Sequence, residues 1–180
     1  MTRTIPQTLL EKYDVPAPRY TSYPTVPYWD FSTINENSWK EQVAKIFLEE
    51  QRELSLYMHL PYCESLCTFC ACNKRITKNH AVEEPYIQTL LKEWQLYLDI
   101  LPGKPVIREI HLGGGTPTFF SPANLRKLIQ GITSSSIIAT DHAFSIEAHP
   151  GNTTEAHLQA LSGAGFNRIS VGVQDFDPVA

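Results

Sequence analysis

The four cysteines of this 180-residue chain all fall within ten consecutive positions, in the run CESLCTFCACN. They are Cys63, Cys67, Cys70 and Cys72. A disulfide-rich protein spreads its cysteines to close long loops, so this clustering indicates a metal or cluster site instead. The CxxxCxxC spacing of the first three suits a short loop that binds three irons of a [4Fe-4S] cluster. The fourth iron would then stay open to an external ligand.

Zinc binding and electron transfer are the alternatives that this spacing leaves open. A structural zinc site usually pairs two ligand groups separated by roughly a dozen residues, and no CxxC or HxxxH group follows downstream. A zinc site could still use all four cysteines, and a ferredoxin-like electron carrier would bind its cluster through four cysteine ligands. Four thiols without a metal role are the remaining interpretation.

Composition and charge narrow the class of protein. Apolar residues make up 42% of the chain and charged residues 19%, which is typical of a globular domain. The net charge is −4, and no basic cluster suggests nucleic-acid binding. No stretch approaches the roughly 20 apolar residues of a membrane helix, and the first residues lack the apolar core of a signal peptide. We therefore expect a cytoplasmic protein without a nucleic-acid or membrane partner.

Residues 1–52 are predicted to form an N-terminal arm followed by one helix. Residues 1–31 contain five prolines and six aromatic side chains, so we expect an extended arm that packs across a folded domain, without regular helix. Ser38 and Glu41 form a capping-box pair, and the apolar stripe after them predicts a helix up to about Glu50.

Residues 53–180 alternate between strand and helix patterns. The predicted strands cover residues 54–60, 106–112, 143–148 and 168–173. Between them, we expect helices over residues 82–101, from Ser121 through Ile132, and from Thr153 or Thr154 to Gly163. Strands and helices in this order form parallel sheets with right-handed crossovers. The predicted fold class is therefore α/β.

Each predicted strand carries apolar residues on one face and polar residues on the other. The polar faces contain Ser55, Tyr57 and His59; Glu109 and His111; Ser145, Glu147 and His149; and Ser170, Gly172 and Gln174. A sheet covered on both sides would show nearly continuous apolar strands, so this alternation predicts a curved sheet around a polar cavity. A parallel β/α barrel, partial or complete, explains the pattern best, and ligands in such folds bind at the carboxyl ends of the strands.

Several residues at these carboxyl ends are candidates for ligand binding. The glycine run 113–116 (GGGT) follows a strand directly, so its backbone could approach a ligand or simply form a flexible turn. Glu147 needs a partner on a core strand, which could be a ribose diol, a cationic ligand group or an internal ion pair. Gln174 could bond a ligand or neighbouring backbone. Tyr57 and His59 point into the same cavity, although His59 could equally be a hydrogen-bonded core histidine.

The run CESLCTFC resembles the cluster motif of the radical S-adenosylmethionine (SAM) superfamily, and GGGT resembles that superfamily's element at the end of the second strand. The resemblance implies that Cys63, Cys67 and Cys70 bind a [4Fe-4S] cluster whose open iron chelates SAM. It places Phe69 near the adenine of SAM. It assigns no side chain as an acid or base, because the radical comes from the cofactor, and it leaves the roles of His59 and Cys72 open.

Five segments sharpen the resemblance: PRYTSYPT, SLYMHLPYC, CTFCACNK, HLGGGTPT and GFNRISVGVQDF. Together they are similar to the oxygen-independent coproporphyrinogen III oxidase family; the related haem-chaperone branch, the alternative, typically lacks PRYTSYPT and the fourth cysteine. The resemblance implies oxidative decarboxylation of two propionates, which converts coproporphyrinogen III to protoporphyrinogen IX. It implies a monomer, an unidentified reducing electron donor and two SAM molecules. The residues expected to contact one or other SAM are Tyr57, Phe69, Gly114, Gly115, Thr116, Glu147 and Gln174.

The length of the chain limits how much of a complete radical SAM barrel it can form. A partial barrel of the radical SAM type has six strands, whereas the fourth predicted strand here ends seven residues before Ala180. We therefore expect residues 53–180 to be the first part of such a barrel, truncated after its fourth strand. Alone, this part is expected to expose an open sheet edge and to lack turnover.

Overall fold

The computed structural model describes residues 6–15, 26–32, 34–67, 70 and 72–172, in two units, Met1–Trp39 and Lys40–Ala180. In the first unit, α1 spans Gln7–Tyr13 and a short 3-10 helix, η1, spans Val26–Tyr28. The prediction of an arm without regular helix is therefore wrong for residues 7–13. Proline disfavours helix only near its own position, and this stretch has no proline between Pro6, the residue that precedes the helix, and Pro16. The packing of the arm stays a prediction.

The helix expected after the arm is α2, Glu36–Glu49, and it begins two residues before the predicted cap. The Asn35 side chain accepts a hydrogen bond from the Ser38 N–H at 2.9 Å, and the Asn35 N–H donates to the Ser38 hydroxyl at 3.1 Å. The reciprocal cap is therefore Asn35 with Ser38, and the expected pair of Ser38 with Glu41 is wrong. Asparagine is as good an N-cap as serine, and here it comes first along the chain.

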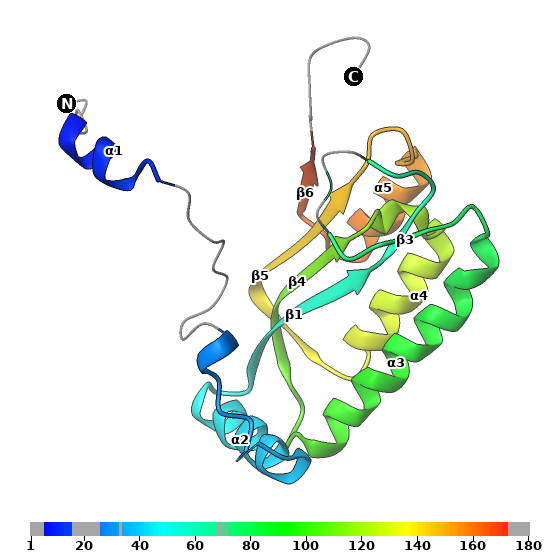
Figure 1. Ribbon diagram of the computed structural model, residues 1–180. Coiled ribbons are helices and arrows are strands. Elements are labelled where there is room, and N and C mark those ends of the chain that lie inside the picture. The colour runs from blue at the N-terminus through cyan, green and yellow to red at the C-terminus, as the bar shows by residue number, and fades with distance from the viewer. Residues whose placement is uncertain (1–5, 16–25, 33, 68–69, 71, 173–180) are drawn as a thin grey trace. The chain divides into compact units, whose positions relative to one another are not determined.

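Four parallel strands form the main sheet of the second unit, in the order β1-β4-β5-β6 (Figure 1). They are β1 (Glu53–Leu60), β4 (Val106–Gly114), β5 (Ile137–Ala148) and β6 (Arg168–Val171). The connecting helices are α3 (Glu83–Ile100), α4 (Pro122–Thr133) and α5 (Glu155–Gly163), with 3-10 turns η2 (His80–Val82) and η3 (Pro117–Phe119) before α3 and α4. The predicted alternation of parallel strands and helices is confirmed.

The apolar faces of the strands pack against the helices in one core. Figure 1 shows α3 and α4 side by side. The core residues include Leu60, Ile110, Leu112, Phe144 and Ile146 from strands, and Ile87, Trp94, Leu125, Leu128, Ile129, Ile132 and Leu161 from helices. Burying apolar area on this scale is the main source of stability, at about 25 cal/mol for each Å². Because the helix side takes the apolar residues, the polar set of each strand lies on the opposite face.

A second, two-stranded parallel ladder was not expected from the sequence. It pairs β2 (Tyr62–Cys63) with β3 (Arg75–Ile76). The Arg75 N–H donates to the Pro61 carbonyl at 2.7 Å, and the Thr77 N–H donates to the Cys63 carbonyl at 2.9 Å. The cysteine loop is therefore tied together at its base, directly after β1.

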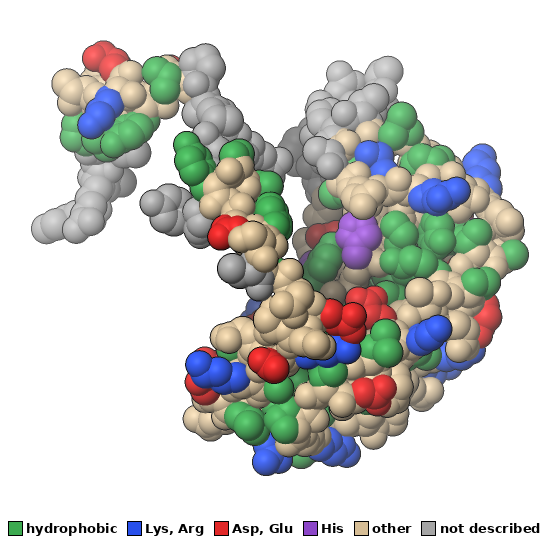
Figure 2. Space-filling model, turned by 60° about the horizontal axis from the view of Figure 1, so that its bottom comes forward, with side chains coloured by type: hydrophobic (Ala, Val, Ile, Leu, Met, Phe, Trp, Pro, Cys, Tyr) green, Lys and Arg blue, Asp and Glu red, His purple; other side chains and the backbone are tan. Residues whose placement is uncertain are grey.

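Two surface features bear on possible partners. No helix in the described part of the chain is long and apolar enough to cross a bilayer. On the face shown in Figure 2, basic and acidic side chains are interspersed.

Candidate functional site

Polar side chains from three adjacent strands meet on the face of the sheet opposite the helices. His111 on β4 lies at their centre: its Nδ1 is 2.7 Å from the Ser145 hydroxyl and its Nε2 is 3.4 Å from a Glu147 carboxylate oxygen. The imidazole also stacks on the Tyr57 ring, with centroids 5.8 Å apart and planes 18° apart. The predicted polar face is therefore a connected network in which each strand positions the side chains of its neighbour.

Tyr57 and His59 extend this network toward the cysteine loop. The His59 Nε2 lies 2.7 Å from the Asn73 carbonyl, so we assign the proton to Nε2. Nδ1 then accepts from the Tyr57 hydroxyl, which is 2.9 Å away. Burial raises the pKa of Tyr57, and the nearby Glu147 carboxylate acts in the same direction. Both nitrogens of His59 thus have partners within the chain, and one of these partners follows the last cysteine.

Glu147 has two of the internal partners that its position on a core strand requires. One carboxylate oxygen faces His111, and the other accepts a hydrogen bond from the Gly114 N–H at 3.1 Å. About 45% of its side chain remains exposed. A carboxylate has more acceptor positions than these two contacts use, so Glu147 is held in place and can still bind a hydroxyl or cationic group.

The glycine run is required by close contacts within the chain itself. Gly114 has a φ of +113°, which disfavours any side chain, and a Cβ there would lie 2.8 Å from the His59 ring. A Cβ on Gly115 would lie 2.7 Å from the backbone of Pro61. A Cβ on Gly113 would fill the space between the side chains that make up the polar face, at 3.0 to 3.2 Å from Tyr57, His111 and Glu147. The absence of a side chain at each of these glycines therefore lets the surrounding polar side chains and backbone pack closely against the run.

The backbone donors after Gly114 continue the sheet toward the first cysteine. The Gly115 N–H donates to the Leu60 carbonyl and the Thr116 N–H to the Tyr62 carbonyl, both at 2.9 Å. The Thr116 hydroxyl lies 3.3 Å from the Cys63 sulfur. The segment expected to contact SAM is thus built directly against a residue expected to bind the cluster.

The cysteines differ in their surroundings. Cys63 is buried, Cys70 is half-buried, and Cys67 and Cys72 are exposed. A hydrogen bond from the Cys72 backbone N–H lowers the pKa of Cys70, and the Lys74 ammonium acts in the same direction. Burial raises the pKa of Cys72. The surroundings of Cys70 and Cys72 therefore shift the pKa values of the two thiols in opposite directions.

The chemistry of these donors fits a [4Fe-4S] cluster. Three thiols on one short loop are the ligands that such clusters take, each on a separate iron. Among the described residues, no three histidine, cysteine, aspartate or glutamate side chains are grouped to hold a metal ion.

Two of the predicted site residues, Phe69 and Gln174, lie outside the described residues. The others lie at or just beyond the carboxyl ends of β1, β4 and β5. His111 and Ser145 were expected on the polar face but not singled out as site residues. The sequence feature that could have identified them is the alternation of polar and apolar residues along each strand, because each lies on the polar face that also carries the predicted site residues. No sequence pattern indicated that His111 would contact Tyr57, Ser145 and Glu147 together.

Comparisons with known proteins agree with this geometry. The family model described as the radical SAM superfamily matches residues 57–179. The anaerobic coproporphyrinogen III oxidase 1 of Cereibacter sphaeroides is 40% identical over 167 residues, which cover 93% of this chain and 36% of that protein. The oxygen-independent coproporphyrinogen III oxidase of Helicobacter pylori (strain 26695) is 40% identical over 181 residues, covering 97% of this chain and 38% of that protein.

A solved structure supports the fold assignment. It is the coproporphyrinogen III oxidase of Escherichia coli, described as a radical SAM enzyme, with a TM-score of 0.79 and 34% sequence identity. The match covers 94% of this chain and 37% of that one. This structural match confirms the fold class predicted from the sequence, a parallel partial β/α barrel. The chain spans little more than a third of the length of the relatives it matches.

Proposed function

This chain belongs to the radical SAM superfamily and is homologous to the oxygen-independent coproporphyrinogen III oxidases, and we propose that it forms the cluster- and SAM-binding part of such an enzyme. The reaction proposed is the conversion of coproporphyrinogen III to protoporphyrinogen IX by oxidative decarboxylation of two propionates. The observation that carries the proposal is the position of the CxxxCxxC loop, tied at its base against the polar carboxyl edge of the sheet. The similarity to these oxidases over nearly the whole chain supports the choice of substrate.

We assign cluster binding to Cys63, Cys67 and Cys70. The β2–β3 ladder holds the two ends of their loop together, which lowers the entropy cost of bringing the three thiols to one cluster. When bound, the cluster and SAM supply the one-electron chemistry that removes a hydrogen atom from an unactivated C–H group. No side-chain base could remove that hydrogen as a proton, because such a group is far too weak an acid.

The chain's own contribution to SAM binding is to orient the polar groups that surround Gly113. His111 and the Gly114 N–H fix Glu147, and the exposed part of that carboxylate is available for a ribose diol or an ammonium group. The Tyr57 ring stacks on the same imidazole. The proposed contacts with the two SAM molecules are made by Tyr57, Phe69, Gly114, Gly115, Thr116, Glu147 and Gln174.

The proposed partners are coproporphyrinogen III and a reducing electron donor, and the proposed state is a monomer. The proposed compartment is the cytoplasm, because four thiols on one loop need a reducing environment to stay available for a cluster.

Electron paramagnetic resonance of the anaerobically reconstituted, reduced chain tests the cofactor assignment. We expect a [4Fe-4S] signal that changes when SAM is added, because SAM binds the open iron. A cluster signal that SAM leaves unchanged would support a fully ligated electron carrier instead. Failure to bind any cluster, with zinc bound in its place, would contradict the proposal altogether.

A chimeric protein tests the substrate assignment. In it, this chain replaces the corresponding region of the Escherichia coli relative, which supplies the remaining length. We expect the chimera to convert coproporphyrinogen III to protoporphyrinogen IX, measured by fluorescence of the oxidised porphyrins. A folded chimera that cleaves SAM but leaves coproporphyrinogen III unchanged would overturn the substrate and leave the superfamily assignment intact.

A further inference from the structure

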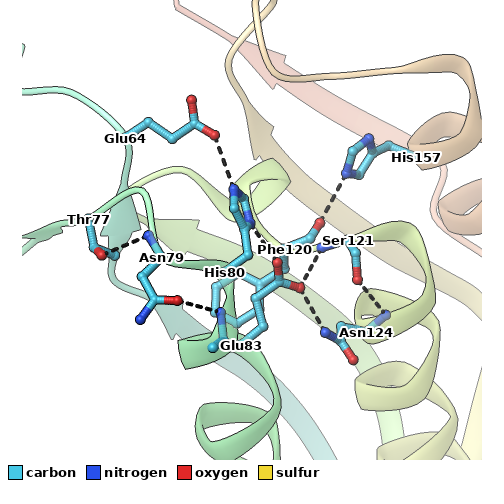
Figure 3. A network of polar contacts seen from close by, with 10 residues as sticks. Glu64, Thr77, Asn79, His80, Glu83, Phe120, Ser121, Asn124 and His157 are labelled. Atoms are coloured by element: carbon cyan, nitrogen blue, oxygen red, sulfur yellow. Dashed lines mark hydrogen bonds and ion pairs between the residues drawn. The ribbon is translucent and has the colours of Figure 1, made fainter.

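A buried carboxylate joins α3 to α4 at the edge of the core. Glu83, the first residue of α3, is only 3% exposed. One of its oxygens accepts hydrogen bonds from the Ser121 N–H and the Asn124 side-chain amide, both at 2.7 Å (Figure 3). The other lies 2.7 Å from the Nδ1 of His80. A buried carboxylate is tolerated only with such partners, so the position of Glu83 is closely determined.

The hydrogen bonds decide the charge of this group. Burial alone disfavours a charged carboxylate, but the bonds from Asn124, Ser121 and His80 together outweigh it and lower the pKa of Glu83. The side chain is therefore a fixed anion at neutral pH. It also lies at the amino-terminal end of α4, where the helix dipole favours negative charge.

His80 extends this arrangement toward the cysteine loop. Its ring stacks on Phe119, with centroids 4.3 Å apart and planes 11° apart. With Nδ1 turned to Glu83, Nε2 faces the Glu64 carboxylate at 3.3 Å. The backbone of His80 is held as well, because the Asn79 side chain accepts from the Ala81 N–H. The ring therefore has one available orientation, and Figure 3 shows it between the two carboxylates.

Glu64 is the residue immediately after Cys63, the first predicted cluster ligand. Cys63 and Glu64 both contact the segment 77–80. The Cys63 carbonyl accepts a hydrogen bond from the Thr77 N–H, and the Glu64 side chain contacts His80. The contact between Glu64 and His80 adds nothing to the core, because their side chains are 42% and 50% exposed. Exposed ion pairs contribute little to global stability, so the effect to test for this contact is a local one, on the conformation of the loop.

We propose that His80, held by the buried Glu83, is a positioning residue that fixes Glu64 and thereby the start of the cysteine loop for cluster binding. This inference rests on the proposed function, because it takes the loop to be the cluster site. It adds a direct connection from the α3–α4 layer to the first ligand, which the spacing of the cysteines does not contain.

Substitutions at Glu64 and His80 separate positioning from folding. Glu64→Ala removes the contact but leaves Glu83 and its helix caps intact, and Glu64→Gln retains an acceptor at the same reach. His80→Asn keeps a donor near Glu83 but is too short for Glu64. The matched control is Glu84→Ala, which removes the next carboxylate of α3; this one is exposed and pairs with Lys127. All variants are made in the 180-residue chain.

The readouts are hydrogen exchange of residues 64–77 in the metal-free chain, and the rate of iron loss to a chelator after reconstitution. An exposed ion pair shifts an equilibrium by about two- to fivefold, so we expect both rates to rise by that factor in Glu64→Ala and His80→Asn. Glu64→Gln should restore part of the difference. The melting temperatures of the two Glu64 variants, and both rates in Glu84→Ala, should match the wild type, whereas His80→Asn also loses the stacking on Phe119 and is compared at equal distance from its own melting temperature.

Different outcomes contradict different claims. If both rates in Glu64→Ala and His80→Asn equal those of the wild type, the positioning role is wrong. If they rise only in step with a general loss of melting temperature, the contact is merely structural and the proposal is also wrong. If the wild-type chain binds no cluster at all, the proposed function fails, and hydrogen exchange still decides whether His80 holds the loop.

Discussion

Replacing Glu83 by alanine should destabilise the metal-free chain by about 2 to 4 kcal/mol, because two buried donors lose their acceptor. These donors are the Ser121 N–H and the Asn124 amide, each 2.7 Å from the carboxylate. An unsatisfied buried donor costs about 1 to 3 kcal/mol, and partial access of water reduces the sum. The third donor, His80, is half-exposed and can turn to solvent, so we assign it no large cost.

Glu83→Gln gives a graded comparison of the same size and shape. The glutamine oxygen can still accept from Ser121 and Asn124, while its NH2 group faces His80, whose ring can take the other tautomer. What is lost is the charge, and bonds to a charged acceptor are roughly twice as strong as neutral ones. We therefore expect about half the cost of the alanine variant, roughly 1 to 2 kcal/mol.

Urea unfolding followed by circular dichroism at 222 nm measures both variants. In thermal unfolding, the alanine variant should melt about 4 to 16 °C below the wild type, at 2 to 4 °C for each kcal/mol in a chain of this size. The control is Glu84→Ala, whose exposed pair with Lys127 contributes at most about 1 kcal/mol. If Glu83→Ala costs no more than this control, the argument from buried donors is refuted.

The difference between wild type and Glu83→Ala should also depend on pH. The lowered pKa of Glu83 means that its contribution is present above the ordinary value of 4.5 and is lost as pH falls through the folded value. The raised pKa of His80, due first to its bond with Glu83, means that its smaller contribution is present below 6.5 and is lost as pH rises through the folded value. The difference should therefore be largest between about pH 4.5 and 6.5.

Three further predictions concern the site itself. Cys67→Ser should abolish the [4Fe-4S] absorbance and iron content, whereas Cys72→Ser should retain both; equal loss in the two would favour a site with four cysteine ligands. Gly114→Ala should lower stability by at least about 1 to 3 kcal/mol, because its φ of +113° disfavours a side chain, and an unchanged urea midpoint would contradict this. His111→Phe keeps a ring beside Tyr57 but removes the bond to Glu147, so SAM titration of the cluster signal should show about five- to tenfold weaker binding with little change in melting temperature; unchanged SAM affinity would show that His111 does not orient the site.

Patterns of period and capping were sufficient for much of the fold. The alternation in β1 placed Met58 and Leu60 toward the helices and Tyr57 on the other face, as observed. Ser121 caps α4 as expected, because a serine followed by proline is a strong local signal. In α5, hydropathy does not decide burial, because Leu158 is exposed while His157 beside it is buried. There a hydrogen bond from the ring to the Phe120 carbonyl, together with the helix cap, overrides hydropathy.

Long-range polar contacts were beyond the reach of the sequence. The pairing of β2 with β3 involves two residues on each side, which is too short to give a periodic pattern. Glu83 reads from its sequence as an ordinary acidic residue in the first turn of a helix, as Glu84 does. Its burial depends on where Ser121 lies, almost forty residues later, and only tertiary structure decides that.

The two halves of the site, the polar strand face and the cysteine loop, are each held by contacts within the chain. On the strands, His111 already contacts Tyr57 and Glu147, so a ligand binding there meets groups that need little reordering. The three thiols expected to bind the cluster lie on one short loop whose ends the β2–β3 ladder holds together. Bringing these thiols to one cluster costs less conformational entropy when more of the loop is held beforehand. The β2–β3 ladder and the contact between His80 and Glu64 both act on this cost, from the base of the loop and from its first residue after Cys63.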